Sequence, residues 1–224
     1  SFGAWVVWDA SHAAGAIEMN FDANGVDLAV GCTYKYGNSG PGSPAWLYVR
    51  KRVQKELQVP IQGWFGNEDQ FGMGPEYVKA EGIRGFQIAS PSIIGIRGVQ
   101  TAFSMIEEAG ISVIAHKAAV GTQMMIDLYD AWLADLGYTL LTSRDPNERG
   151  GHISIGHPQA AQICVALRKF ANVIPDYRTP NAIRLAIAPL PTSYVEIWDG
   201  FERLRDLTLS RKYEEIKGSD SRVT

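Results

Sequence analysis

A single lysine stands between two tyrosines in residues 31–42, and three glycines and a proline follow it: Gly31-Cys32-Thr33-Tyr34-Lys35-Tyr36-Gly37-Asn38-Ser39-Gly40-Pro41-Gly42 (GCTYKYGNSGPG). One almost wholly apolar segment, 28–32, runs into this stretch, and another, 45–49, leaves it. Continuous apolar runs of this length are typical of strands whose sheet is covered on both faces, as in α/β folds. The sequence therefore predicts an α/β protein in which Lys35 stands at the end of a buried strand.

A carboxylate occupies the corresponding place after an earlier strand. Residues 4–8 are apolar and Asp9 follows them, and the separation from Asp9 to Lys35 is that of a strand–helix–strand unit. Open α/β sheets bind ligands beyond the carboxyl ends of their strands, so both side chains would face one crevice. A lysine amine can attach pyridoxal phosphate (PLP), and a carboxylate can pair with its protonated ring nitrogen. Taken singly, Asp9 could instead cap the turn at Ser11, and Lys35 could extend to solvent.

The rest of the chain predicts helices and strands with a break near Gly110. We expect helices at about 90–109, with Ser90 as cap and Pro91 as first helical residue, at 112–137, 158–170 and 194–209, and strands at 153–155 and 182–187. Ser193 and Glu196 form a capping box at the start of the last helix. The elements divide into residues 1–111, part of a mainly parallel sheet, residues 112–209, a smaller α+β domain, and a polar tail, 210–224.

Composition excludes several classes of partner. The net charge of -3 and the lack of a basic stripe argue against nucleic acid, and no apolar run is long enough to cross a membrane. Cys32 and Cys164 form neither a CxxC pair nor a disulfide framework, which favours a reducing, cytoplasmic location. His116, His152 and His157 lack the spacing of metal ligands, so we expect no metal site.

Two motifs, WDASHAAGA at residues 8–16 and GCTYKY at residues 31–36, carry a specific resemblance. Weaker motifs continue it in order: Gly40-Pro41-Gly42, Gly63-Trp64-Phe65-Gly66, Gly85-Phe86-Gln87-Ile88, Arg149-Gly150-Gly151-His152, and Ile183-Arg184 before Ala188-Pro189-Leu190. Together they resemble the kynureninase family, whose members are PLP-dependent hydrolases with the type I aminotransferase fold. The resemblance implies that this chain is the C-terminal part of the PLP-binding large domain followed by the small C-terminal domain.

The same resemblance assigns a cofactor role to residues near the first two strands. Lys35 would form the Schiff base with PLP and later carry a proton. Asp9 would hold the pyridine nitrogen and His12 would support the cofactor. Tyr34 would reach the cofactor phosphate and help to deliver a proton.

Three further residues receive roles in this way. Trp64 would approach the phosphate from the neighbouring subunit of a homodimer, whose active sites are therefore shared. Arg184 would clamp the α-carboxylate of an amino-acid substrate through its bidentate guanidinium. Ser90 stands where family members often carry Asn or Thr near the cofactor.

The implied reaction is hydrolysis of L-kynurenine, or of 3-hydroxy-L-kynurenine, to anthranilate or 3-hydroxyanthranilate and L-alanine in tryptophan catabolism. Full-length relatives have an N-terminal portion before the WDxxH strand, so the resemblance implies that this chain is a fragment that needs such a portion.

Two alternatives stay open. One is another type I PLP enzyme, an aminotransferase or a cysteine desulfurase, although neither Cys32 nor Cys164 suits a mobile nucleophile. The other is a non-catalytic binding fragment.

Overall fold

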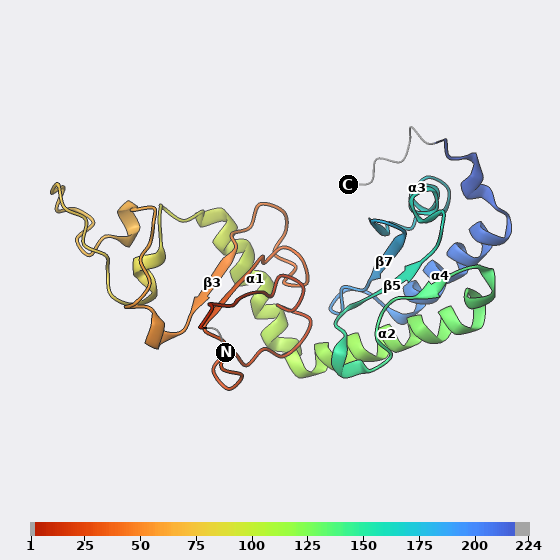
Figure 1. The fold of residues 1–224 in the computed structure, drawn as a ribbon, viewed down its shortest axis with the longest axis horizontal. Coiled ribbons are helices and arrows are strands. Elements are labelled where there is room, and N and C mark those ends of the chain that lie inside the picture. Colours follow the sequence, from red (N-terminus) through yellow and green to blue (C-terminus); the bar gives the residue numbers. More distant parts are fainter. Residues whose placement is uncertain (1–2, 218–224) are drawn as a thin grey trace. The chain divides into compact units, whose positions relative to one another are not determined.

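The computed structural model describes residues 3–217, and residues 1–2 and 218–224 lie outside this description. The chain divides into two compact units, Ser1–Glu108 and Ala109–Thr224. Figure 1 labels the main helices and strands of both units. Each unit combines a small sheet with helices, which gives the chain the mixed α/β character that its sequence predicts.

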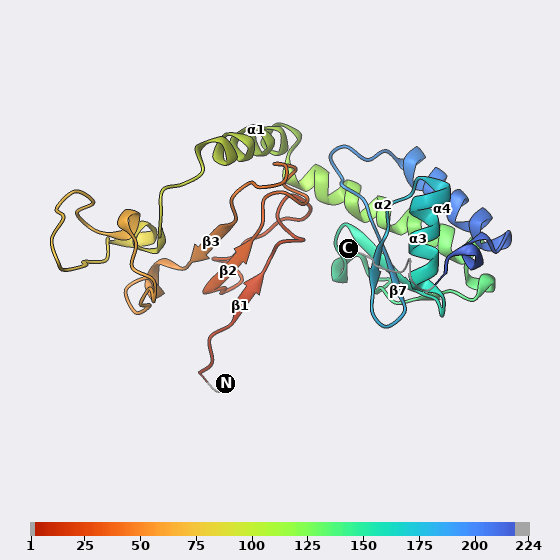
Figure 2. The ribbon, with the colours of Figure 1, turned by 90° about the horizontal axis from the view of Figure 1, so that it is seen from above.

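The first unit is built on a three-stranded sheet in the order β1 (Val7–Asp9), β2 (Leu28–Gly31) and β3 (Trp46–Val49), seen side by side in Figure 2. Strands β1 and β2 pair in parallel, as predicted, whereas β3 pairs with β2 antiparallel. A loop without a crossover helix joins β2 to β3, and an antiparallel neighbour needs no crossover. The expectation of a mainly parallel sheet therefore holds for only one of the two pairings.

Strand β1 differs from its prediction in length, cover and connection. It begins at Val7, and Val7 and Trp8 are more than half exposed, so the described residues do not by themselves cover both faces of this strand. Hydrogen-bonded turns, and no α-helix, occupy residues 11–17 before β2. Gly15 has a φ of +85° within these turns, a conformation that interrupts a right-handed helix.

Helix α1 (Ile93–Ala109) closes the first unit, after three short 3₁₀ turns, η1 (Lys51–Val53), η2 (Trp64–Gly66) and η3 (Gly82–Phe86). The Ser92 hydroxyl accepts a hydrogen bond of 3.2 Å from the Gly95 amide, so the cap is Ser92 and the prediction of Ser90 is wrong. The helix ends before Gly110, which adopts a φ of +82°.

The second unit has a four-stranded antiparallel sheet in the order β4 (Thr139–Leu140), β5 (His152–Gly156), β7 (Ala182–Ala186) and β6 (Asp176–Arg178). Helices α2 (Ile111–Trp132) and α3 (Ala160–Ala171) contact its strands, and α4 (Tyr194–Leu209) packs on both helices. Two further 3₁₀ turns, η4 (Ala134–Leu136) and η5 (Pro146–Glu148), precede β4 and β5.

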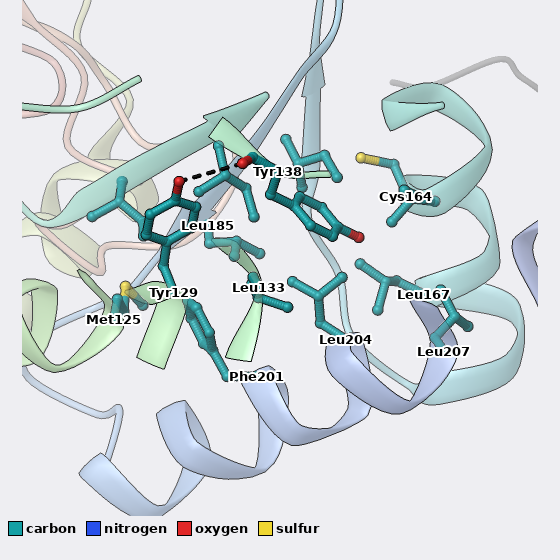
Figure 3. Packing of buried hydrophobic residues seen from close by; sticks show 14 of the residues in the cluster. Met125, Tyr129, Leu133, Tyr138, Cys164, Leu167, Leu185, Phe201, Leu204 and Leu207 are labelled. Atoms are coloured by element: carbon teal, nitrogen blue, oxygen red, sulfur yellow. Dashed lines mark hydrogen bonds between the residues drawn. The ribbon is translucent and has the colours of Figure 1, made fainter. Parts of the chain in front are cut away.

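The core of the second unit lies between the sheet and its helices, where apolar side chains from all three helices meet those of β5 and β7 (Figure 3). The Ser193–Glu196 capping box is present and α4 ends at Leu209, as predicted. Part of the polar tail expected from residue 210 is folded, because the turn η6 (Lys212–Glu215) follows α4 and Tyr213 and Ile216 are buried. The remainder of that tail, 218–224, lies outside the described residues.

Candidate active site

The ends of β1 and β2 bring Asp9 and the segment of Lys35 to the same edge of the first sheet. Asp9 is the last residue of β1 and lies opposite Val30 in the parallel register. Lys35 follows soon after β2 ends at Gly31. Because parallel strands end at one edge, the chain segments that carry the two predicted cofactor residues leave the sheet at the same edge.

Backbone groups of the intervening turn tie the two segments together. The Ser11 amide donates to Oδ1 of Asp9 over 2.9 Å, and the Cys32 amide donates to the Ser11 hydroxyl over 3.2 Å. The turn also passes very close to the chain after Lys35, since a Cβ on Gly15 would lie 2.5 Å from the Tyr36 carbonyl oxygen. Asp9 therefore caps the turn at Ser11, which is the alternative role that the sequence offers for it, and it also lies at the edge of the sheet.

The charge on Asp9 is stabilised by its surroundings. Two hydrogen bonds from Ser11 lower the pKa of Asp9 most, burial raises it by less, and the charges of Lys35 and then His12 contribute smaller decreases. Asp9 is thus an anion at neutral pH. The influence of Lys35 and His12 on its pKa indicates that these three predicted residues share one local electrostatic environment.

Lys35 is partly buried, and its Nζ lies 5.9 Å from the centre of the Tyr34 ring. The loop beyond it is fixed by internal hydrogen bonds, among them Thr33 Oγ1 to the Pro44 carbonyl at 2.7 Å. Gly37 is enclosed by the Thr33 carbonyl and the Phe103 ring, so a larger residue has no room there. The backbone on either side of Lys35 is therefore tightly packed and held by hydrogen bonds.

A hollow of about 440 Å³ adjoins Asp9. Its walls are mainly apolar and include Trp8, Ala13, Ile17 and Phe21. Lys35 is not among the residues that line this hollow. Asp9 is consequently accessible from a partly apolar space, which suits the pairing of its charge with a ring cation.

Trp64 and Ser90 lie in other parts of the first unit. The Trp64 Nε1 donates to the Gln70 carbonyl over 2.5 Å, and its ring packs edge-on against Phe65 and Phe71. Ser90 is exposed on the rim of a shallow hollow of about 520 Å³. None of the contacts described for these two residues is to Asp9 or Lys35, so the structure does not bring them together with the predicted cofactor residues.

Arg184 belongs to the second unit, where it occupies the middle of β7. It stands opposite Ser154 of β5 on one side and opposite Asp176 of β6 on the other. Arg184 forms a very short ion pair with Asp176, whose carboxylate also binds Arg178. Sequence reasoning missed Asp176, because its partner depends on a strand register that the sequence pattern does not reveal.

His152 lies diagonally across from Arg184 on the neighbouring strand β5. Burial lowers the pKa of His152, and the positive charge of Arg184 lowers it further. The imidazole is therefore neutral at pH 7, and Arg184 and Arg178 carry the positive charge of this part of the sheet.

The residues of the first unit have the chemistry that PLP requires. An ionised carboxylate, Asp9, can hold a protonated ring nitrogen, and a partly buried lysine, Lys35, can attach the cofactor aldehyde.

Within residues 3–217, no group of His, Cys, Asp and Glu side chains could hold a metal ion. Over the same residues, every helix is too short or too polar to span a bilayer.

Comparison with known proteins supports the motif-based resemblance. The family model "Kynureninase C-terminal domain" matches residues 114–204. Kynureninase from Pseudomonas fluorescens is 34% identical over 210 residues, which are 94% of this chain and 50% of that protein. The chain therefore spans about half the length of the curated relatives it matches, and its resemblance to kynureninase is confirmed.

Solved structures with the same fold include PLP enzymes of other activities. The apo cysteine desulfurase of Thermococcus onnurineus NA1 has a TM-score of 0.72 at 20% identity, over 93% of this chain and 53% of that one. A C-DES mutant with glycine covalently linked to its PLP cofactor has a TM-score of 0.71 at 17% identity, over 87% of this chain and 49% of that one. These likenesses confirm the type I PLP-transferase fold.

Proposed function

We propose that this chain, which is related to the kynureninases over 94% of its length, forms part of a PLP-dependent hydrolase that cleaves L-kynurenine or 3-hydroxy-L-kynurenine. The products are anthranilate or 3-hydroxyanthranilate and L-alanine. The observation that carries the proposal is that Asp9 and the segment of Lys35 leave the sheet at one edge, within the two motifs most specific to the family.

The proposed cofactor residues of the first unit each have a role in this reaction. Lys35 would attach the cofactor through its amine, and the same amine would remove the proton from the substrate Cα. PLP, when bound, supplies a ring that accepts the electron pair left at that carbon. Asp9, which keeps its negative charge, would hold the protonated ring nitrogen, and His12 would support the cofactor. Tyr34, whose side chain is half exposed beside Lys35, would contact the phosphate and return a proton to the product.

Arg184 binds the substrate in this proposal. Its guanidinium can hold both oxygens of an α-carboxylate through two parallel hydrogen bonds. Arg184 is held by strand pairing on both sides, so its backbone is well fixed for the task. Ser90 keeps the place near the cofactor that the family resemblance gives it, although the hollow that it lines contains none of the other proposed cofactor residues.

The active enzyme also requires polypeptide beyond this chain. Strand β1 ends the described sheet, and Trp5, Val6, Val7 and Trp8 are each more than 50% exposed. An apolar sheet edge of this kind is a template for another strand or a covering segment. We propose that an N-terminal portion of the same enzyme covers it, and that Trp64 and its aromatic neighbours meet a second copy in a homodimer with shared sites.

A cysteine desulfurase activity is disfavoured by both thiols. Burial raises the pKa of the Cys164 thiol to about 12, so it is protonated and inert at neutral pH. Cys32 is held at the end of β2, where its sulfur contacts the Ser11 carbonyl over 3.8 Å and its amide binds the Ser11 hydroxyl. Cys164 therefore lacks the thiolate character, and Cys32 the mobility, that a desulfurase nucleophile needs.

The proposal is tested by supplying the chain with the N-terminal portion and PLP and measuring release of L-alanine and the aromatic acid. L-kynurenine and 3-hydroxy-L-kynurenine are compared side by side, which also determines the preferred substrate. Turnover of either one is the expected result. A preparation that binds PLP but releases no product from both substrates would contradict the proposed reaction.

A further inference from the structure

We propose that Asp176 is a positioning residue whose carboxylate holds the Arg184 guanidinium in the orientation that receives the α-carboxylate of an amino-acid ligand. The inference rests on the role proposed for Arg184 and deepens it with a residue that none of the motifs contains. It concerns only side chains of the second unit.

Strand pairing places three polar residues in one row across the sheet. Ser154 of β5, Arg184 of β7 and Asp176 of β6 are directly opposite one another in the register. Side chains at directly paired positions project to the same face of a sheet. Their neighbours in sequence, Ile153 and Ile183, project to the other face and are fully buried in the core. The row therefore lies on the face opposite to the helices.

The carboxylate of Asp176 is itself fixed from its own strand. Its Oδ2 accepts hydrogen bonds from Nε and a terminal nitrogen of Arg178 at 3.0 and 2.7 Å, and a third, very short one from Arg184. The side chains of Asp176 and Arg184 are only 28% and 21% exposed, so their pairing is less screened than that of a surface pair. Arg178 thus anchors the carboxylate, and the carboxylate restricts the rotation of Arg184.

The contact leaves most of the Arg184 guanidinium available. Of its five N–H donors, the hydrogen bonds described for residues 3–217 use one, on a terminal nitrogen. At least one edge with two parallel donors remains, which is what a bidentate carboxylate requires. Two guanidinium groups and one carboxylate leave a single positive charge, which matches a ligand that carries one negative α-carboxylate. His152 adds no charge at pH 7, as its lowered pKa indicates.

The test compares Asp176→Asn with a matched control in the PLP-loaded enzyme assembled from this chain and the portion proposed above. Asn keeps the size and one acceptor oxygen of Asp176 and removes its charge. The control is Asp130→Asn, because Asp130 binds Arg144 with two hydrogen bonds of 2.7 and 2.8 Å on the surface of the same unit. Two ligands are measured by calorimetry: L-alanine, and ethylamine, which lacks the α-carboxylate.

We expect Asp176→Asn to weaken L-alanine binding about tenfold, because the hydrogen bond from Arg184 to a neutral amide is weaker than that to a carboxylate and holds the guanidinium less firmly. Ethylamine binding should change less than about twofold, since only the carboxylate is received by Arg184. With substrate, KM should rise while kcat stays nearly constant, and Asp130→Asn should leave every value unchanged. Asp176→Glu, which restores the charge, should recover part of the loss.

Other outcomes separate the inference from the proposed function. Unchanged L-alanine binding in Asp176→Asn, together with weakened binding in Arg184→Lys, overturns the inference and leaves the role of Arg184 intact. An equal loss for both ligands also overturns it, because the effect would then be structural. If the unaltered enzyme releases no product from kynurenine but Asp176→Asn still weakens L-alanine binding selectively, the inference stands and the proposed reaction fails.

Discussion

The Ser11 hydroxyl accepts a hydrogen bond of 3.2 Å from the Cys32 amide, and this bond joins the two segments that carry the predicted cofactor residues. The Ser11 amide binds Asp9 on one side of the bond, and Lys35 follows Cys32 on the other. Asp9 and Lys35 form no ion pair with each other. Backbone geometry thus sets their separation, and the lysine amine remains available for a cofactor.

Lys35→Ala should abolish covalent attachment of PLP and reduce turnover by about 10³-fold, which is within the range for loss of a general base. Because its side chain is only partly buried, the fold should persist, and circular dichroism should be unchanged. Borohydride treatment followed by peptide mass spectrometry of the unaltered enzyme should find the label on Lys35.

Lys51 provides the control for this assignment, since it is an exposed lysine of the same unit. Lys51→Ala should retain both label and turnover. Label on any lysine other than Lys35 would remove Lys35 from its proposed role, whatever the activity of the variants.

Gly15→Ala should destabilise the first unit and weaken PLP binding. The new Cβ would lie 2.5 Å from the Tyr36 carbonyl oxygen at a φ of +85°, so the turn of Asp9 and the chain after Lys35 would have to move apart. Gly25→Ala is the matched control, because Gly25 has a φ of +69° but open space around it. Both changes carry the conformational cost of about 1–2 kcal/mol for a left-handed residue.

Urea unfolding of the two glycine variants separates these effects. We expect Gly15→Ala to lower the free energy of unfolding by roughly 1–3 kcal/mol more than Gly25→Ala, the range for strain at a close backbone contact. PLP affinity should fall only in Gly15→Ala. Equal losses in both variants would mean that the close approach of the two segments is not needed.

Local signals in the sequence predict much of the fold. The Ser193–Glu196 capping box and the glycine after α1 identify helix ends because the signal and the structure that it stabilises are neighbours in the chain. The start of α1 shows the limit of such signals. Ser90 and Ser92 flank the same proline, and only the Gly95 amide, which binds Ser92, distinguishes them.

Features that depend on distant residues could not be predicted in this way. The direction of β3 follows from the path of the loop before it, and apolar patterning is the same for either direction. Strand β6 is short and polar, and it exists through its pairing with β7. Asp9 and Lys35 could be proposed from strand ends, whereas Asp176 became a candidate only when its register with Arg184 was known.

Arg184→Lys should raise KM for the amino-acid substrate about tenfold and leave kcat nearly unchanged. Lysine keeps the charge but loses the planar fork that receives two carboxylate oxygens. Steady-state kinetics on the assembled enzyme provide the measurement, and Arg144→Lys is the control because Arg144 pairs with Asp130 on the surface of the same unit. Unchanged kinetics in Arg184→Lys would exclude Arg184 from substrate binding.

His157 should make the free energy of unfolding depend on pH below neutrality. His157 is 6% exposed, its ring contacts those of Tyr138 and Tyr213, and its Nδ1 accepts a hydrogen bond of 3.0 Å from the Gln159 amide. Burial lowers its pKa from the usual value of 6.5. As pH falls below 6.5, His157 binds a proton in the unfolded chain but stays neutral in the folded protein. The free energy of unfolding therefore decreases until the pH reaches the pKa of His157 in the folded protein.

Urea unfolding at several pH values between 7.5 and 5 should show this loss, with a slope from one histidine of at most about 1.4 kcal/mol per pH unit. His157→Asn retains an acceptor for the Gln159 amide but cannot titrate, so its slope should be smaller even if it is less stable throughout. His116→Asn, at an exposed position of α2, should keep the full slope. Because His152 is present in all three proteins, equal slopes for His157→Asn and the unaltered chain would assign the pH dependence to other groups.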